Sequence, residues 1–304
     1  MTYTHGRMDS VTSRFDATDL ENRNSGFDAA QEAISAQRCI VMPTDTVYGI
    51  AADAFSAQAV ATLLACKGRG RNMPPPVLIP SAQTLDGLAI DVPASARALA
   101  EEFWPGALTL ILHAQPSLTW DLGDTRGTVA LRVPDDEVAL GLLSRTGPLA
   151  VSSANRTGQP AASTAQQAFD QLGESVDVYL EAGFRPVTGG QSIGSTIIDC
   201  TLTPPRVVRE GALSIQQLRV VVPELLDIDG VSIDSAASSE VSETSETSET
   251  SDSTEAADDA ELLEATGQLD EESQQQIPAH EGDVADAANG APKTDKTSGH
   301  NVNP

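Results

Sequence analysis

The chain has 304 residues, which is enough for one large domain or two small ones. Its 18 basic and 44 acidic residues give a net charge of −26, and this disfavours sequence-independent binding of nucleic acid, which needs a basic surface. The first thirty residues lack an apolar signal-peptide core, and no apolar run approaches the roughly 20 residues that span a bilayer. We therefore expect a cytoplasmic protein with no membrane-spanning segment.

Apolar periodicity, prolines and glycines predict alternating short helices and strands between a polar N-terminus and residue 222. We expect a flexible segment over 1–15 and a catalytic α/β domain over 16–222, with strands too short and too often interrupted by turns for a regular Rossmann sheet. The predicted helices are 28–37, 56–65, 81–88, 93–103, 137–144, 164–172 and 214–220. The predicted strands are 39–42, 77–80, 108–113, 127–134, 149–151, 176–181, 197–200 and 206–208.

The composition changes at about residue 230. Residues 231–304 hold 18 acidic residues and two lysines, a net charge of −16, and Ser-Glu-Thr triplets repeat over 242–250. So few apolar residues cannot offset an ordering cost of about 1–2 kcal/mol per residue. We expect 231–304 to be a disordered, solubilising acidic tail, and the alternative is a short partner-binding helix at 261–264.

The cysteines indicate a reducing compartment. Cys39, Cys66 and Cys200 form no CxxC pair, which argues against a disulfide framework. Cys39 and Cys200 lie in apolar runs and are expected in the core. Cys66 precedes Lys67, whose charge could lower the thiol pKa, but no histidine motif accompanies it and a catalytic thiol is not favoured. The four histidines are scattered, so no zinc site is expected.

Residues 43–71 hold the densest run of unusual chemistry and predict a strand–loop–helix unit. Lys67 is the only lysine before Lys293, and Arg69 and Arg71 follow it with glycines between them. Glycines let the backbone approach an anion, arginine binds phosphate bidentately, and lysine acts as a point charge. The P-loop and the GxGxxG loop are both absent. A solvated basic turn is the alternative.

Three further polar segments adjoin short apolar strands. Residues 152–158 offer hydroxyl and amide groups that suit a polar ligand and equally suit an ordinary turn. The second segment is 194–196, and the third is Arg209, for which a surface ion pair is the alternative. Arg132 shares a face of its strand with Thr128 because strand side chains alternate.

The joint occurrence of these segments predicts one site built from several strand ends. The sequence offers no Ser–His–Asp set and no paired carboxylates. The chemistry would then depend on positioning and charge stabilisation rather than on a side-chain nucleophile.

Seven motifs in this order resemble the YrdC family of threonylcarbamoyl-AMP synthases, over about residues 25–215. They are PTDTVYGIAADA, KGRGR followed by an apolar strand, FWPGALTLIL, GTVALRVP, SSANRTG, GSTIIDCT and VVREGAL. The resemblance does not reach the acidic tail, and we expect a short form without the extra C-terminal domain of longer family members.

The resemblance implies a YrdC-like twisted mixed sheet with flanking helices around a large concave, positively lined site. It implies a nucleotidyltransferase that joins L-threonine, bicarbonate and ATP into threonylcarbamoyl-AMP and releases pyrophosphate, with Mg²⁺ accompanying ATP. A separate transferase complex would then modify tRNA beside the anticodon, so we expect only weak or indirect tRNA contact by this chain. The alternatives are a carbamoyl-adenylate-forming enzyme and a non-catalytic RNA-binding YrdC-like domain.

The resemblance also assigns residues by motif. Lys67 and Arg69 are the expected catalytic pair on the phosphates. The threonine-contacting positions correspond to Thr46, Arg132, Ser153 and Ser195, and the ATP-contacting positions to Lys67, Arg69, Thr128, Asn155, Ser163 and Arg209.

The chain departs from the family pattern after KGR. Many members carry Asn-Pro-Leu and then a histidine near the threonine site, where this chain has Met73-Pro74-Pro75 and Leu78. Arg71 and Asn72 are candidate replacements for the lost asparagine. A Ser-Pro-Thr run is replaced by Ala161-Ala162-Ser163.

Overall fold

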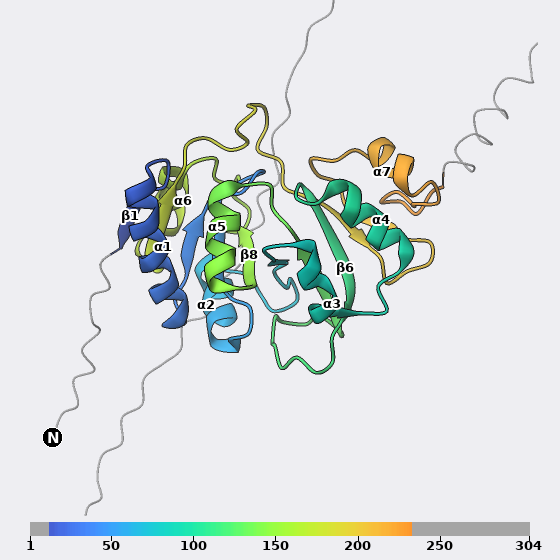
Figure 1. Cartoon of the computed structure of the whole chain (residues 1–304), viewed down its shortest axis with the longest axis horizontal. Helices are drawn as coiled ribbons and strands as arrows, with labels where there is room; N and C mark the ends of the chain where they lie inside the picture. The colour runs from blue at the N-terminus through green and yellow to red at the C-terminus, as the bar shows by residue number, and fades with distance from the viewer. Residues whose placement is uncertain (1–11, 233–304) are drawn as a thin grey trace, which may run out of the picture. The chain divides into compact units, whose positions relative to one another are not determined.

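The computed structural model describes residues 12–232 (Figure 1). Residues 1–11 and 233–304 lie outside the described part, so the disordered acidic tail and most of the flexible N-terminus stay predictions. No helix within residues 12–232 combines the length and the apolar character needed to cross a membrane.

Within residues 12–232, eleven strands form one twisted mixed sheet, which confirms the predicted α/β class. Their order is β1-β9-β2-β3-β8-β4-β7-β6-β10-β11, and β5 pairs with β6. Parallel and antiparallel neighbours alternate irregularly, so strand ends from distant parts of the sequence meet at the middle of the sheet. The strands are β1 (Ser13–Asp16), β2 (Ile40–Met42), β3 (Gly49–Asp53), β4 (Val77–Leu78), β5 (Ala89–Ile90), β6 (Leu108–Ala114), β7 (Thr128–Arg132), β8 (Leu149–Ser153), β9 (Val178–Glu181), β10 (Thr196–Asp199) and β11 (Arg206–Arg209).

Helices cover both faces of the sheet, and a hydrophobic core lies on each side. The helices are α1 (Leu20–Ser35), α2 (Ala57–Lys67), α3 (Leu85–Leu88), α4 (Ala94–Phe103), α5 (Glu137–Thr146), α6 (Ala165–Leu172) and α7 (Ile215–Val221). Helices α1 and α5 pack side by side over one core (Figure 1), and α2, α3, α4, α6 and α7 contribute to the other. Alternation in β2 divides its side chains between the two cores: Ile40 and Met42 join the first, and Val41 joins the second.

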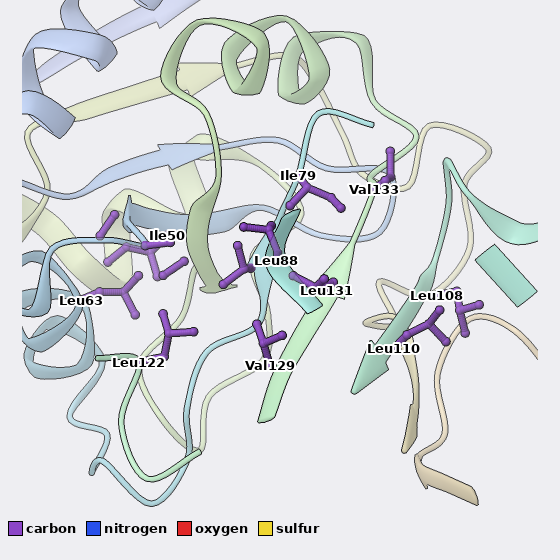
Figure 2. Close-up of a cluster of buried hydrophobic side chains, with 14 of the residues drawn as sticks. Ile50, Leu63, Ile79, Leu88, Leu108, Leu110, Leu122, Val129, Leu131 and Val133 are labelled. Carbon is purple, nitrogen blue, oxygen red and sulfur yellow. The ribbon is translucent and has the colours of Figure 1, made fainter. Parts of the chain in front are cut away.

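A hydrophobic core packs against one face of β6 and β7, and this fixes which of their side chains face the functional site. Figure 2 shows Val129 and Leu131 in β7 and Val133 directly after it, with Leu108 and Leu110 from β6 in the same cluster. The predicted alternation of the β7 strand is therefore confirmed. Since neighbouring strand residues face opposite ways, the intervening residues of β6 and β7 face away from this core.

Three strands, β1, β3 and β5, are absent from the sequence prediction. β5 has only two residues and pairs with β6. β3 has the sequence GIAAD, which is rich in residues of low β propensity. It forms because antiparallel pairing on both sides, to β2 and β8, satisfies its backbone at the centre of the sheet. β1 pairs in parallel with β9 from Ser13 onward, so the sheet begins upstream of the predicted boundary at residue 16.

At the C-terminal end the chain continues past the predicted limit of 222. Leu226 forms a parallel bridge with Arg206 at the edge of the sheet. Residues beyond α7 therefore belong to the folded unit.

Candidate functional site

A cavity of about 250 Å³ lies where β3, β4, β7 and β8 meet the segments before β10 and after β11. Hydroxyl groups and guanidinium groups dominate its polar wall, and Glu210 is the one carboxylate among the described residues that line it. Six of the predicted site residues line this cavity, namely Thr46, Arg69, Arg132, Ser153, Ser195 and Arg209. Strand ends that are far apart in sequence thus build one positively lined site.

Arg132 ends β7 and is held in place on three sides. Its guanidinium donates from Nε to the Gly106 carbonyl at 2.9 Å and from Nη1 to Thr46 Oγ1 at 3.1 Å. Nη2 pairs with the Asp45 carboxylate at 2.6 Å, and the residue is only 5% exposed. A guanidinium fixed in this way presents a charged, planar donor to an incoming carboxylate without reorganisation.

Arg209 lies across the cavity and clamps the segment before β10. Its Nη2 donates to the Ser195 carbonyl at 2.6 Å and to Ser195 Oγ at 3.0 Å. Burial lowers the pKa of the Arg209 guanidinium, and repulsion from Arg132 and Arg69 lowers it further. Arg69, Arg132 and Arg209 line the same cavity, and an anionic ligand would relieve the repulsion between them.

Arg69 has donor capacity to spare. Nη1 donates to Ser152 Oγ at 3.1 Å, while Nε is buried and has no partner among the described residues. A buried donor without a partner is costly, and a ligand oxygen would satisfy it. Burial also lowers the pKa of this guanidinium.

Lys67 does not line the cavity. It ends α2, where Gly68 caps the helix in the left-handed region at φ 63°, and it is 2% exposed. Nζ donates to the Ser153 carbonyl, to the Asn155 carbonyl at 2.7 Å and to Asn155 Oδ1 at 3.3 Å. These three acceptors use all three ammonium protons. Lys67 therefore anchors the loop after β8 rather than presenting its charge to the cavity.

The protonation of Lys67 is sensitive to its surroundings. Burial, with repulsion from Arg69 added, lowers the pKa of Lys67 to about 8. The carbonyl acceptors favour the charged form and oppose this shift. The ammonium form prevails at neutral pH.

Three other predicted ATP contacts lie off the cavity wall. Thr128 is at the opposite end of β7 from Arg132, and its hydroxyl donates to a carbonyl three residues upstream at 2.7 Å. Asn155 donates from Nδ2 to two carbonyls of its own loop. Ser163 Oγ lies 2.6 Å from Ser192 Oγ. Their roles as ligand contacts stay predictions, and the same holds for Lys67.

The cavity wall also contains residues that the sequence reasoning did not assign, notably Thr44, Thr109 and Ser152. Thr109 is a polar residue within the apolar run 108–112, and this is the sequence signal that points to a functional position. Leu78, which stands in place of the family histidine, lines the cavity and lies opposite Arg132 in the β4–β7 register. The site therefore has an apolar wall at that position.

The suggested replacement by Arg71 stays a prediction, and the contacts of Arg71 in this structure point away from it. Its guanidinium makes two hydrogen bonds to Asp121, at 2.7 and 3.1 Å, and it does not line the cavity. The expectation for Cys66 also changes. The pKa of its thiol is lowered, but the largest cause is a hydrogen bond with the Cys39 thiol rather than the charge of Lys67.

The cavity is poorly suited to holding a metal ion through protein ligands. Within residues 12–232, no group of three or more histidine, cysteine or carboxylate side chains could bind one. Mg²⁺ is commonly held by substrate phosphates, waters and one or two carboxylates. The residues present thus do not form a resident Mg²⁺ site.

Comparisons with known proteins identify the family of this chain. The Sua5/YciO/YrdC family model, described as "Telomere recombination", matches residues 32–211. A Mycobacterium tuberculosis protein, provisionally named a threonylcarbamoyl-AMP synthase, is 50% identical over 223 residues, which are 73% of this chain and 99% of the relative. The Pyrococcus abyssi threonylcarbamoyl-AMP synthase is 32% identical over 203 residues, and the match covers 66% of this chain and 58% of that protein.

A solved structure shares the fold. The crystal structure of P. abyssi Sua5 complexed with L-threonine superposes with a TM-score of 0.63 at 29% identity, covering 74% of this chain and 64% of that one. The family match spans more than half of the chain, and the M. tuberculosis relative is matched over almost its whole length. The chain belongs to the Sua5/YciO/YrdC family.

Proposed function

We propose that this protein is an L-threonylcarbamoyladenylate synthase, a nucleotidyltransferase that joins L-threonine, bicarbonate and ATP and releases pyrophosphate. The observation that carries the proposal is the convergence of Arg69, Arg132 and Arg209 with the hydroxyl groups of Thr46 and Ser195 in one cavity. Three guanidiniums match a ligand set with a carboxylate and several phosphates. The names of the relatives support the same reaction.

The reaction fits a site without a protein nucleophile. The threonine amine forms a C–N bond with bicarbonate, and loss of water gives the carbamate. A carbamate oxygen then attacks the α-phosphorus of ATP, the bond to the bridging oxygen breaks, and pyrophosphate leaves. Arg132 binds the threonine carboxylate, and Arg69 and Arg209 stabilise charge on the phosphates. Lys67 keeps Ser153 and Asn155 in position.

The remaining parts of the proposal follow from this chemistry. Mg²⁺ arrives with ATP as part of the substrate. The product passes to a separate transferase complex that modifies tRNA beside the anticodon, in the cytoplasm. This chain itself contacts tRNA weakly or indirectly, which is supported by its net charge of −26.

The test is detection of threonylcarbamoyl-AMP by mass spectrometry after incubation with the three substrates and with each omitted in turn. We expect product and pyrophosphate only in the complete mixture. Pyrophosphate release without threonine, together with carbamoyl-AMP, would instead identify the carbamoyl-adenylate alternative. Tight tRNA binding at physiological salt without adenylate formation would favour the RNA-binding alternative.

A further inference from the structure

Thr109 is a fully buried hydroxyl in the floor of the cavity. It lies in β6 between Leu108 and Leu110, which face the hydrophobic core, so alternation turns it to the cavity side. Its exposed fraction is 0%, and its Oγ1 lies 2.7 Å from Ser195 Oγ. No other partner for this hydroxyl exists among the described residues.

The direction of this hydrogen bond follows from counting protons. A hydroxyl with no exposed surface cannot donate to water, so the Thr109 proton needs an acceptor inside the protein. Ser195 Oγ is the acceptor within reach. Ser195 Oγ also accepts a hydrogen bond from Arg209 Nη2 at 3.0 Å. These two donors occupy both lone pairs of Ser195, which leaves its own proton for the cavity.

Thr46 lines the same cavity and is oriented in a similar way. Its Oγ1 accepts from Arg132 Nη1 at 3.1 Å and from Nη2 at 3.2 Å, which occupies both lone pairs. Thr44 Oγ1 lies 3.1 Å from Thr46 Oγ1, but it donates to the Val47 carbonyl and accepts from the backbone N–H groups of Thr46 and Val47. The donors around Thr46 and Ser195 therefore leave the proton of each hydroxyl for a ligand.

We propose that Thr109 is a positioning residue that holds the Ser195 hydroxyl as a hydrogen-bond donor to a carboxylate or carbamate oxygen of the threonine substrate. This inference rests on the proposed function. Thr109 does not itself touch the ligand in this scheme. Its effect is to prevent the Ser195 proton from turning inward.

The test uses three variants of the full chain. Thr109→Val keeps the shape of the side chain and removes the hydroxyl, so the Ser195 proton loses its fixed direction. We expect the KM and Kd for L-threonine to rise about fivefold to tenfold, the effect of losing roughly one hydrogen bond, while the Kd for ATP stays within about twofold. Thr109→Ser restores the hydroxyl and should restore threonine binding. Thr146→Val removes a hydroxyl from the end of α5, outside the cavity, and should change neither constant.

A double-variant cycle separates positioning from packing. If Thr109 acts through Ser195, Thr109→Val should add no further loss of threonine affinity in a Ser195→Ala background. Additive losses, an equal loss of ATP affinity, or failure of Thr109→Ser to restore binding would each overturn the inference. Wild-type protein that makes no threonylcarbamoyl-AMP would overturn the proposed function instead, and the two failures are therefore distinguishable.

Discussion

The structure makes a sharp prediction for Lys67→Met. Methionine approximates the length of the lysine stem but removes the ammonium group that donates to the Ser153 and Asn155 carbonyls and to Asn155 Oδ1. The backbone carbonyl of Lys67 also accepts from Thr157 at 3.1 Å, so α2 and the loop after β8 are joined at this point. The substitution should release a loop that contributes directly to the cavity wall.

The size of the effect follows from the contacts. A hydrogen bond from a charged donor contributes about 1.5–3 kcal/mol, and removing the donor leaves buried acceptors unpaired. Relief of the desolvation cost of a buried charge offsets part of this loss. We expect a net fall of about 2–4 kcal/mol in the free energy of unfolding, which a domain with a typical 5–15 kcal/mol should survive.

Chemical denaturation with separate binding titrations provides the assay. A loop anchor predicts a lower free energy of unfolding and weaker binding of both threonine and ATP, because Ser153 moves with the loop. Lys67→Arg is the matched control for charge and should not restore the geometry, since a planar fork cannot reproduce three contacts from one nitrogen. Unchanged stability and threonine affinity, with only ATP binding lost, would refute the anchor role and favour direct phosphate contact.

Three further predictions concern the same region. Gly49→Ala should lower the free energy of unfolding by about 1–3 kcal/mol in denaturation curves, because a Cβ would lie 2.5 Å from Val151 Cγ1. Gly87→Ala is the control and should not lower the free energy of unfolding, because nothing lies within 4 Å of the added Cβ. Arg132→Lys should raise the KM for threonine at least tenfold, because an ammonium cannot keep the three-sided contacts of the guanidinium and bind a carboxylate; an unchanged KM would contradict this. Above pH 8, the affinity for both threonine and ATP should fall as Lys67 deprotonates and its contacts with the loop after β8 weaken. The pKa of Lys67 is lower in the folded chain than in the unfolded chain, so the unfolded chain binds more protons above pH 8. The free energy of unfolding of the wild-type protein should therefore rise above pH 8 relative to that of Lys67→Met. Parallel pH profiles of the two proteins would contradict this.

Local patterns were enough to predict most of the elements. The strands at β6 and β7 and the helix α5 have strong apolar periodicity, and the structure places them within a few residues of the predicted bounds. β3 was missed because its Gly-Ile-Ala-Ala-Asp sequence has no local strand signal. It forms only because two partner strands satisfy its backbone, and that is a non-local cause.

The sequence by itself determined the chemistry of this protein: which guanidiniums, hydroxyls and glycines follow the strands, and the ordered motifs that mark the family. The tertiary structure decided which of those groups face the ligand. Lys67 and Arg69 are two residues apart, yet the turn at Gly68 directs one into the protein and the other toward the cavity. Thr109 meets Ser195 only because β6 and β10 are parallel neighbours. Hydrogen-bond partners across a sheet depend on strand order and register, and neither is encoded in a local stretch of sequence.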